Sequence, residues 1–118
     1  MFYNKERIGT PPATTAALLE AARSGTRIAF VQNCYMAYGF FNAFDGAVFN
    51  ADGSTSDKRD GVTRALAYLR SLKATAGPSF FSDHPERYDP AFRAGDIDLY
   101  VNGTWAIPDF REALGPKL

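Results

Sequence analysis

Hydrophobic residues recur at helical spacing in several stretches of this 118-residue chain. One helix is predicted to follow a cap at Thr14 or Thr15 and to end at Gly25. Residues 35–44 are apolar nearly all round and are long enough for a second helix. Gly39 lies in the middle of that stretch and costs a helix about 1 kcal/mol relative to alanine.

The clearest amphipathic pattern covers residues 62–73, where leucine and valine keep one apolar face. We expect Asp60 to cap this helix and Gly77-Pro78 to end it. Residues 88–92 predict a short helix, and residues 107–114 predict a last one.

Strand patterns are short and lie between the helical stretches. Residues 27–31 are typical of a buried strand, and residues 97–101 alternate between apolar and polar positions. Residues 2–4 predict a weaker strand, and Val48-Phe49 with the turn at Asp52-Gly53 predicts a small hairpin. Helices that alternate with strands indicate an α/β fold, with a thin, mostly parallel sheet flanked by helices.

Composition narrows the class of protein. The chain has 13 Lys and Arg against 13 Asp and Glu, so its formal net charge is zero and does not favour nucleic acid or anionic lipid as a partner. No apolar run approaches the roughly 20 residues of a membrane span. The length predicts a single domain, 1–118, and the start shows no export signal. We therefore expect either a cytosolic protein or a piece of a longer one.

Residues with reactive side chains give no catalytic pattern. Cys34 is the single cysteine, which excludes an internal disulfide and a thiolate zinc cluster. No orienting residue links it to His84, so we expect a buried cysteine and a surface histidine. Asp96 and Asp98 are either two ligands of a metal ion or, as is more common, surface residues that alternate with the apolar positions of a strand. No phosphate-binding loop is present, so we predict a non-enzyme without metal or cofactor.

Seven spaced motifs resemble those of one family. They are Tyr3-Asn4-Lys5, Pro11-Pro12 with Thr14, Gly25 before Ile28-Ala29-Phe30, the segment Phe44 to Phe49 with Asp52-Gly53, Ala65 to Leu69, Phe92 to Gly95, and Val101 to Trp105 before Phe110 to Gly115. In this order they resemble the solute-binding proteins of bacterial ABC importers, and specifically the carbohydrate-binding group that includes the maltose-binding protein.

The resemblance implies a partial fold of the periplasmic-binding-protein type. Members have two lobes that close around a ligand, and this chain resembles the central part of the carboxy-terminal lobe. The implied partners are a carbohydrate, the missing amino-terminal lobe and the membrane subunits of the importer. The parent protein is then expected in the periplasm or anchored outside the cell.

Three positions depart from the family pattern. Thr15 replaces a common tryptophan, and Thr104 replaces the proline of the family's G-P-W box, where it is still able to cap the last helix. Pro90 lacks a backbone donor and is expected to shorten or break the helix before Phe92.

The candidate ligand residues follow the two best strands. By resemblance, Trp105 matches the stacking tryptophan of the G-P-W box, and the turn at Gly103 exposes it. Asn33 and Tyr35 follow the strand at 27–31, where the family has a polar residue and an aromatic residue that touch sugar, and Tyr38 lies one turn further on. The structural alternatives are a core tryptophan, a plain helix cap at Asn33 and a packed ring at Tyr35.

Two functions remain open. The first is sugar binding as part of an importer's receptor, with the ligand held by aromatic stacking and polar contacts. The second is an isolated interaction fragment without useful ligand affinity, in which an exposed sheet edge favours a homodimer.

Overall fold

Four short strands form one mixed sheet in the computed structural model, which describes residues 1–81 and 85–118. The strand order is β1-β4-β2-β3, in which β4 pairs antiparallel with β1 and parallel with β2, and β2 pairs parallel with β3. The strands are β1 (Phe2–Tyr3), β2 (Ile28–Phe30), β3 (Phe80–Phe81) and β4 (Leu99–Val101). The predicted thin, mostly parallel sheet is confirmed.

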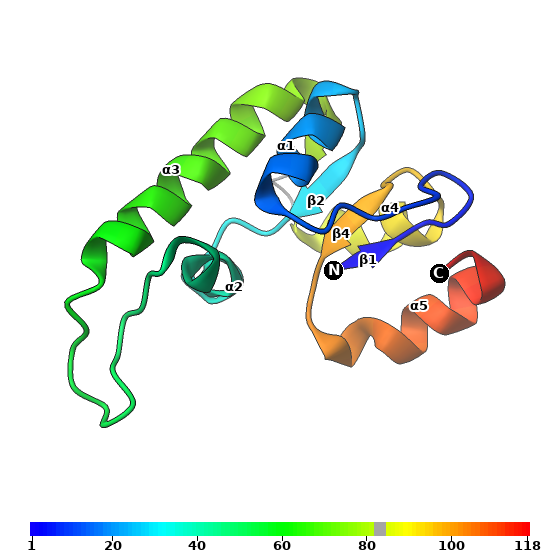
Figure 1. Ribbon diagram of the computed structural model, residues 1–118. Helices are drawn as coiled ribbons and strands as arrows, with labels where there is room; N and C mark the ends of the chain where they lie inside the picture. Colours follow the sequence, from blue (N-terminus) through cyan, green and yellow to red (C-terminus); the bar gives the residue numbers. More distant parts are fainter. Residues whose placement is uncertain (82–84) are drawn as a thin grey trace.

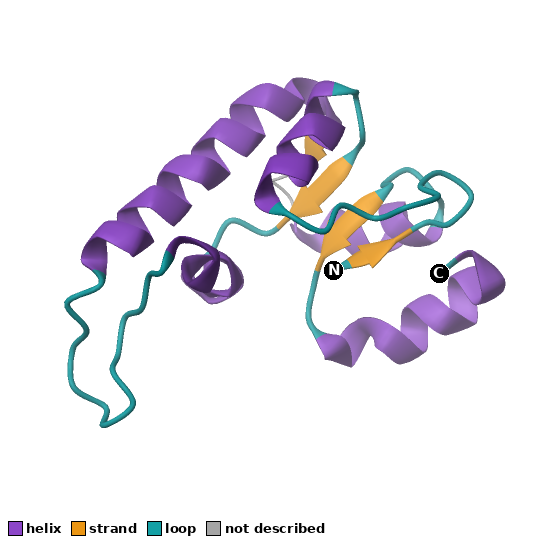
Figure 2. Ribbon diagram, in the orientation of Figure 1, coloured by secondary structure: helices purple, strands orange, loops and turns teal. Residues whose placement is uncertain are grey.

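Helices cover both faces of this sheet (Figures 1 and 2). Side chains alternate along β2, so that Ile28 and Phe30 face one cluster of buried residues and Ala29 faces the other. Helices α1, α2 and α3 pack on the first face, and α4 and α5 pack on the second. The helices are α1 (Thr15–Arg23), α2 (Cys34–Phe41), α3 (Arg59–Ala76), α4 (Tyr88–Arg93) and α5 (Ile107–Leu114).

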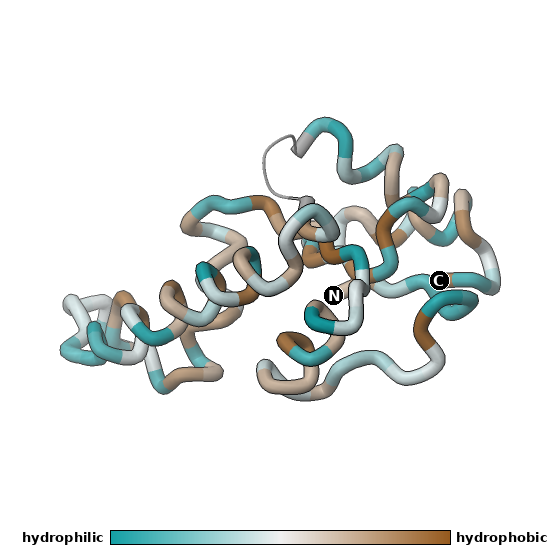
Figure 3. Tube along the Cα trace, turned by 90° about the horizontal axis from the view of Figure 1, so that it is seen from above, coloured by the Kyte–Doolittle hydropathy of each residue, from teal (hydrophilic) through white to brown (hydrophobic). Residues whose placement is uncertain are grey.

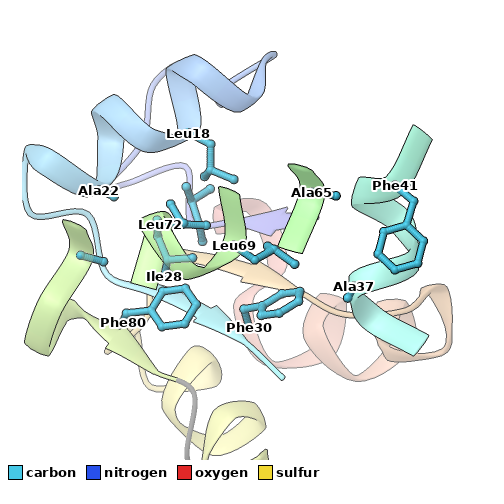
Figure 4. Close-up of a cluster of buried hydrophobic side chains, with 12 residues drawn as sticks. Leu18, Ala22, Ile28, Phe30, Ala37, Phe41, Ala65, Leu69, Leu72 and Phe80 are labelled. Atoms are coloured by element: carbon cyan, nitrogen blue, oxygen red, sulfur yellow. The ribbon is translucent and has the colours of Figure 1, made fainter. Parts of the chain in front are cut away.

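The larger hydrophobic cluster joins β2 to α1, α2 and α3. Figure 4 shows Phe30, Leu69 and Leu72 filling the space between the sheet and the long helix. In Figure 3 hydrophobic, brown segments recur along most of the chain, whereas the far end of the loop before α3 is white to teal. None of the helices in the described residues is long and apolar enough to cross a membrane.

The ends of α1 and the start of α4 follow from the residues found there. The Thr14 hydroxyl accepts a hydrogen bond from the Ala17 amide at 3.0 Å and so caps α1, which stops before Gly25 at φ +86°. Pro90 lies in the first turn of α4, where a helix has no use for its amide, and α4 is short but unbroken.

Two predicted caps are wrong. Helix α3 begins at Arg59, one residue before Asp60, because Lys58 is already held by Ser56 and Asp45. Asp60 lies in the first turn instead, where its charge favours the helix dipole without capping it. Thr104 begins a 3-10 turn, Thr104–Ala106, that precedes α5, and its side chain makes no cap.

The pattern around residues 48–55 and 80–81 was less informative. The predicted hairpin consists of a single antiparallel bridge between Phe49 and Thr55, with Gly53 at φ +83° in its turn. The strand β3 was not predicted, since two phenylalanines are too short a run to show a period. His84 lies outside the described residues.

An ion pair joins the amino ends of β2 and β4. The Arg27 guanidinium donates to both carboxylate oxygens of Asp98, at 2.7 and 3.2 Å, and to the Gly95 carbonyl at 2.8 Å. Asp98 is buried and paired with Arg27, so the expected surface position is wrong for Asp98, whereas Asp96 is exposed. Burial raises the pKa of Asp98, but hydrogen bonds and charge from Arg27 lower it by more, so the net shift is downward.

Replacing Asp98 by Asn is expected to lower the free energy of unfolding by about 2–3 kcal/mol at neutral pH, because Arg27 loses a charged, largely buried partner. The folded-state pKa lies below the ordinary value of 3.8, so this contribution is present above pH 3.8 and is lost as the pH falls through the folded value. Urea unfolding at neutral and acid pH measures it. The exposed pair Arg93–Asp109 is the control, and Asp109→Asn is expected to change stability by less than about 0.5 kcal/mol. Equal effects of the two substitutions would contradict this assignment.

Two glycines allow the loop after α2 to lie against α3. A Cβ atom on Gly61 would overlap the backbone of Asp45 and Gly46, and one on Gly46 would overlap Gly61 and Val62. The Asp45 carboxylate and the Lys58 ammonium close the same loop at 2.8 Å. This close approach holds α2 beside α3.

Gly61→Ala is therefore expected to destabilise the protein by about 1–3 kcal/mol, although alanine favours helix. Gly39→Ala in α2 is the matched control, because a Cβ atom there meets nothing within 4 Å. It is expected to stabilise by about 0.5–1 kcal/mol. Thermal unfolding compares the two, and effects of the same sign would show that the contact at Gly61 is unimportant.

Candidate functional site

The carboxyl ends of β2 and β4 lie side by side. Phe30 pairs with Val101 at the last step of their parallel ladder, so the loops that follow both strands leave from the same edge of the sheet. Open α/β sheets bind ligands at such edges. Here the first loop leads into α2 and the second leads into the turn before Trp105 (Figure 1).

A cavity of about 510 Å³ lies between these two loops. This volume is in the range of small-molecule sites. Its lining comes from α2, from the predicted hairpin and from the end of β4: Cys34, Tyr35, Met36, Tyr38, Gly39, Val48, Phe49, Val101, Asn102, Gly103 and Trp105. The structure thus brings together Tyr35, Tyr38, Gly103 and Trp105, four of the five predicted ligand residues. We call this space the aromatic cavity.

Exposed rings distinguish this cavity from the rest of the surface. Tyr35 is 71% exposed and Trp105 is 59% exposed, and their ring centroids are 6.1 Å apart at an interplanar angle of 34°. Of the six exposed large apolar side chains in the described residues, four line this cavity. Because such side chains gather at binding surfaces, the cavity is the best candidate site. The alternatives of a core tryptophan and a packed Tyr35 do not fit these exposures.

Gly103 leaves room for the Trp105 ring. A Cβ atom at residue 103 would overlap the six-membered part of the indole, so only glycine allows the ring to cover this turn. The φ angle of Gly103 is −80°, an ordinary value. The glycine is therefore required for close approach and not for an unusual backbone conformation.

Asn33 acts as a helix cap in the structure. Its side-chain oxygen accepts a hydrogen bond from the Met36 amide at 2.8 Å, at the start of α2. Asn33 does not line the aromatic cavity, so the cap that the sequence left open as an alternative is present. Its predicted contact with a ligand stays a prediction.

Sequence reasoning missed part of the cavity lining. Phe49 lines the cavity and is 60% exposed. A large aromatic residue beside a polar turn, outside any helical or strand period, was the one sign in the sequence that it lies at the surface. Asn102 directly follows β4, so the rule for strand ends also pointed to it. Cys34 is exposed, and the prediction that it is buried is wrong, because it is the first residue of α2 and lies at the helix surface.

The chemistry of the cavity is neutral. None of its described lining residues is acidic or basic, and its polar groups are the hydroxyls of Tyr35 and Tyr38, the amide of Asn102 and the thiol of Cys34. Within the described residues, no three His, Cys, Asp or Glu side chains come together as a metal site. The arrangement suits a ligand with an apolar face and neutral polar edges.

A second cavity, of about 480 Å³, lies between α2 and α3 and adjoins the first at Cys34 and Val48. Figure 4 shows four of its lining residues, Phe30, Ala37, Phe41 and Leu69, which belong to the hydrophobic cluster. We call it the apolar cavity. It has no exposed aromatic ring in its described lining, and its rim carries Arg70 and Lys73.

Comparison with known proteins identifies the family of the chain. The family model of the bacterial extracellular solute-binding proteins matches residues 1–118. A search of curated proteins found no match. Solute-binding proteins of this kind bind ligands outside the cytoplasm for ABC transport, with membrane subunits as partners, and are not enzymes. The chain belongs to the bacterial extracellular solute-binding proteins.

Proposed function

We propose that the chain binds a neutral carbohydrate in the aromatic cavity, as part of the substrate receptor of an ABC importer. The pair of exposed rings, Tyr35 and Trp105, supports this most directly. A sugar presents C–H groups on its faces and hydroxyls around its edge, so a ring covers the face while polar side chains meet the edge. The neutral lining favours an uncharged sugar over a sugar acid.

Each predicted ligand residue has a distinct role in this proposal. Trp105 and Tyr35 stack on the sugar, and Tyr38 donates or accepts a hydrogen bond at its edge. Gly103 leaves the space that the Trp105 ring occupies, and Asn33 supports the position of Tyr35 by capping α2. An open cavity covers one face of a sugar, whereas tight sites bury about 70–90% of a ligand. The other lobe of the parent protein then covers the opposite face, and the chain alone binds weakly.

Dimerisation through a sheet edge receives less support. The two edge strands, β1 and β3, have two residues each. Natural proteins use such short edges to discourage pairing between sheets.

Titration of the 118-residue chain with maltose, cellobiose, xylobiose and glucuronate tests the proposal. Trp105 is the only tryptophan, so its fluorescence reports occupancy directly. We expect a saturable change with a neutral sugar at millimolar concentration and none with glucuronate. By calorimetry, Trp105→Ala is expected to weaken binding about tenfold or more, because a large aromatic contact is lost.

Leu66→Ala is the control, because Leu66 is 49% exposed and lines the apolar cavity. It is expected to leave the affinity unchanged. Binding that depends on Leu66 and not on Trp105 would move the site to the apolar cavity. The absence of binding by every neutral sugar, in a folded chain, would overturn the proposal.

A further inference from the structure

A hydrogen-bond network outside the aromatic cavity reaches the turn that carries Trp105. One carboxylate oxygen of Asp89, in the first turn of α4, accepts a hydrogen bond from the Tyr100 hydroxyl at 2.9 Å. The same oxygen accepts a second bond from the side-chain amide of Asn102 at 3.3 Å. The Asn102 side-chain oxygen in turn accepts from the Gly103 backbone amide at 2.8 Å. The chain of contacts ends at the glycine that the indole of Trp105 covers.

We propose that Asp89 is a positioning residue of the ligand site, which fixes the turn at residues 102–105 through Asn102. Asp89 does not line the cavity, whereas Asn102, Gly103 and Trp105 do. It determines how Trp105 is presented without touching a ligand. Its effect on affinity rests on the proposed function, but its effect on Trp105 does not.

The anchor of this network is rigid. Tyr100 is 2% exposed, and its ring contacts the rings of Tyr88, Phe92 and Phe110 with centroids 5.7 to 5.9 Å apart. Burial raises the pKa of Tyr100, and the hydrogen bond to Asp89 raises it further, so the hydroxyl keeps its proton. A fixed donor of this kind holds the Asp89 carboxylate in one orientation.

The carboxylate then orients Asn102. An amide side chain has two ends that look alike in shape but differ in hydrogen bonding. Since Asp89 only accepts, it selects the nitrogen end of Asn102, and the oxygen end is left for the Gly103 amide. Loss of Asp89 removes this selection, and the turn before Trp105 gains freedom.

Asp89→Ala tests the inference, with Asp89→Asn as the conservative variant that keeps an acceptor oxygen at the same place. Asp109→Ala is the matched control, because Asp109 lies in α5, is paired with Arg93 and does not contact the turn. Acrylamide quenching of Trp105 is measured without ligand, and the affinity for the neutral sugar is measured by calorimetry. Far-UV circular dichroism checks folding.

We expect Asp89→Ala to increase quenching of Trp105 and to weaken sugar binding about tenfold, as for the loss of a hydrogen bond that orients the site. Asp89→Asn and Asp109→Ala are expected to resemble the wild type in both measurements. If Asp89→Ala does not fold, ligand-free Asn102→Ala breaks the same link at its half-buried end and is expected to increase quenching.

Unchanged quenching in folded Asp89→Ala, or in Asn102→Ala where the first variant does not fold, would overturn the inference. Failure of Asp89→Asn to restore the wild-type quenching would also overturn it. If the wild type binds no sugar, the proposed function fails by itself, and the quenching comparison still decides the role of Asp89.

Discussion

The parallel pairing of β2 with β4 is the constraint on which the rest of the structure depends. At the amino end of the pair, Arg27 and Asp98 join the two strands through the hydrogen bonds of a largely buried ion pair. At the carboxyl end, Phe30 pairs with Val101, and both loops of the candidate site start there. The ion pair at one end of the ladder therefore supports the register of β2 and β4. This register sets the relative positions of the two loops that line the aromatic cavity at the other end.

The two faces of the sheet contribute differently to the site. The face with α1, α2 and α3 positions Tyr35 and Tyr38, because contacts at Gly46 and Gly61 hold α2 against α3. The opposite face, with α4 and α5, buries Tyr100 and anchors the turn before Trp105. The cavity lies at the carboxyl edge of the sheet, and a ligand there contacts side chains from elements that are anchored on both faces.

Local patterns predicted the parts of the fold that depend on local physics. Helical spacing and a threonine cap were sufficient for α1, and the β-rich runs at 27–31 and 97–101 were sufficient for β2 and β4. Asp98 shows the limit, since its partner Arg27 lies 71 residues away and an alternating pattern alone gives it a surface position. The predicted caps at Asp60 and Thr104 failed because the sequence pattern did not give the first residue of either helix: α3 begins one residue before Asp60, and a 3-10 turn that includes Thr104 precedes α5.

For the candidate site, the sequence placed Tyr35 and Trp105 at the sheet edge where the aromatic cavity lies, but it did not predict the whole lining of that cavity. Tyr35 and Trp105 were predicted because they follow the two central strands, and the structure places their rings together. Phe49 reaches the cavity from a separate loop, and Asn33 points its oxygen into its own helix. The position of Phe49 depends on tertiary geometry, whereas the Asn33 cap is local and was one of the two interpretations that the sequence left open.

The position of the site is tested most directly by heteronuclear NMR of the labelled chain during titration with a neutral oligosaccharide. We expect amide shift changes that cluster at residues 34–39, 48–49 and 101–105 and that saturate together. Changes centred on residues 62–73, around the apolar cavity between α2 and α3, would contradict this position of the site.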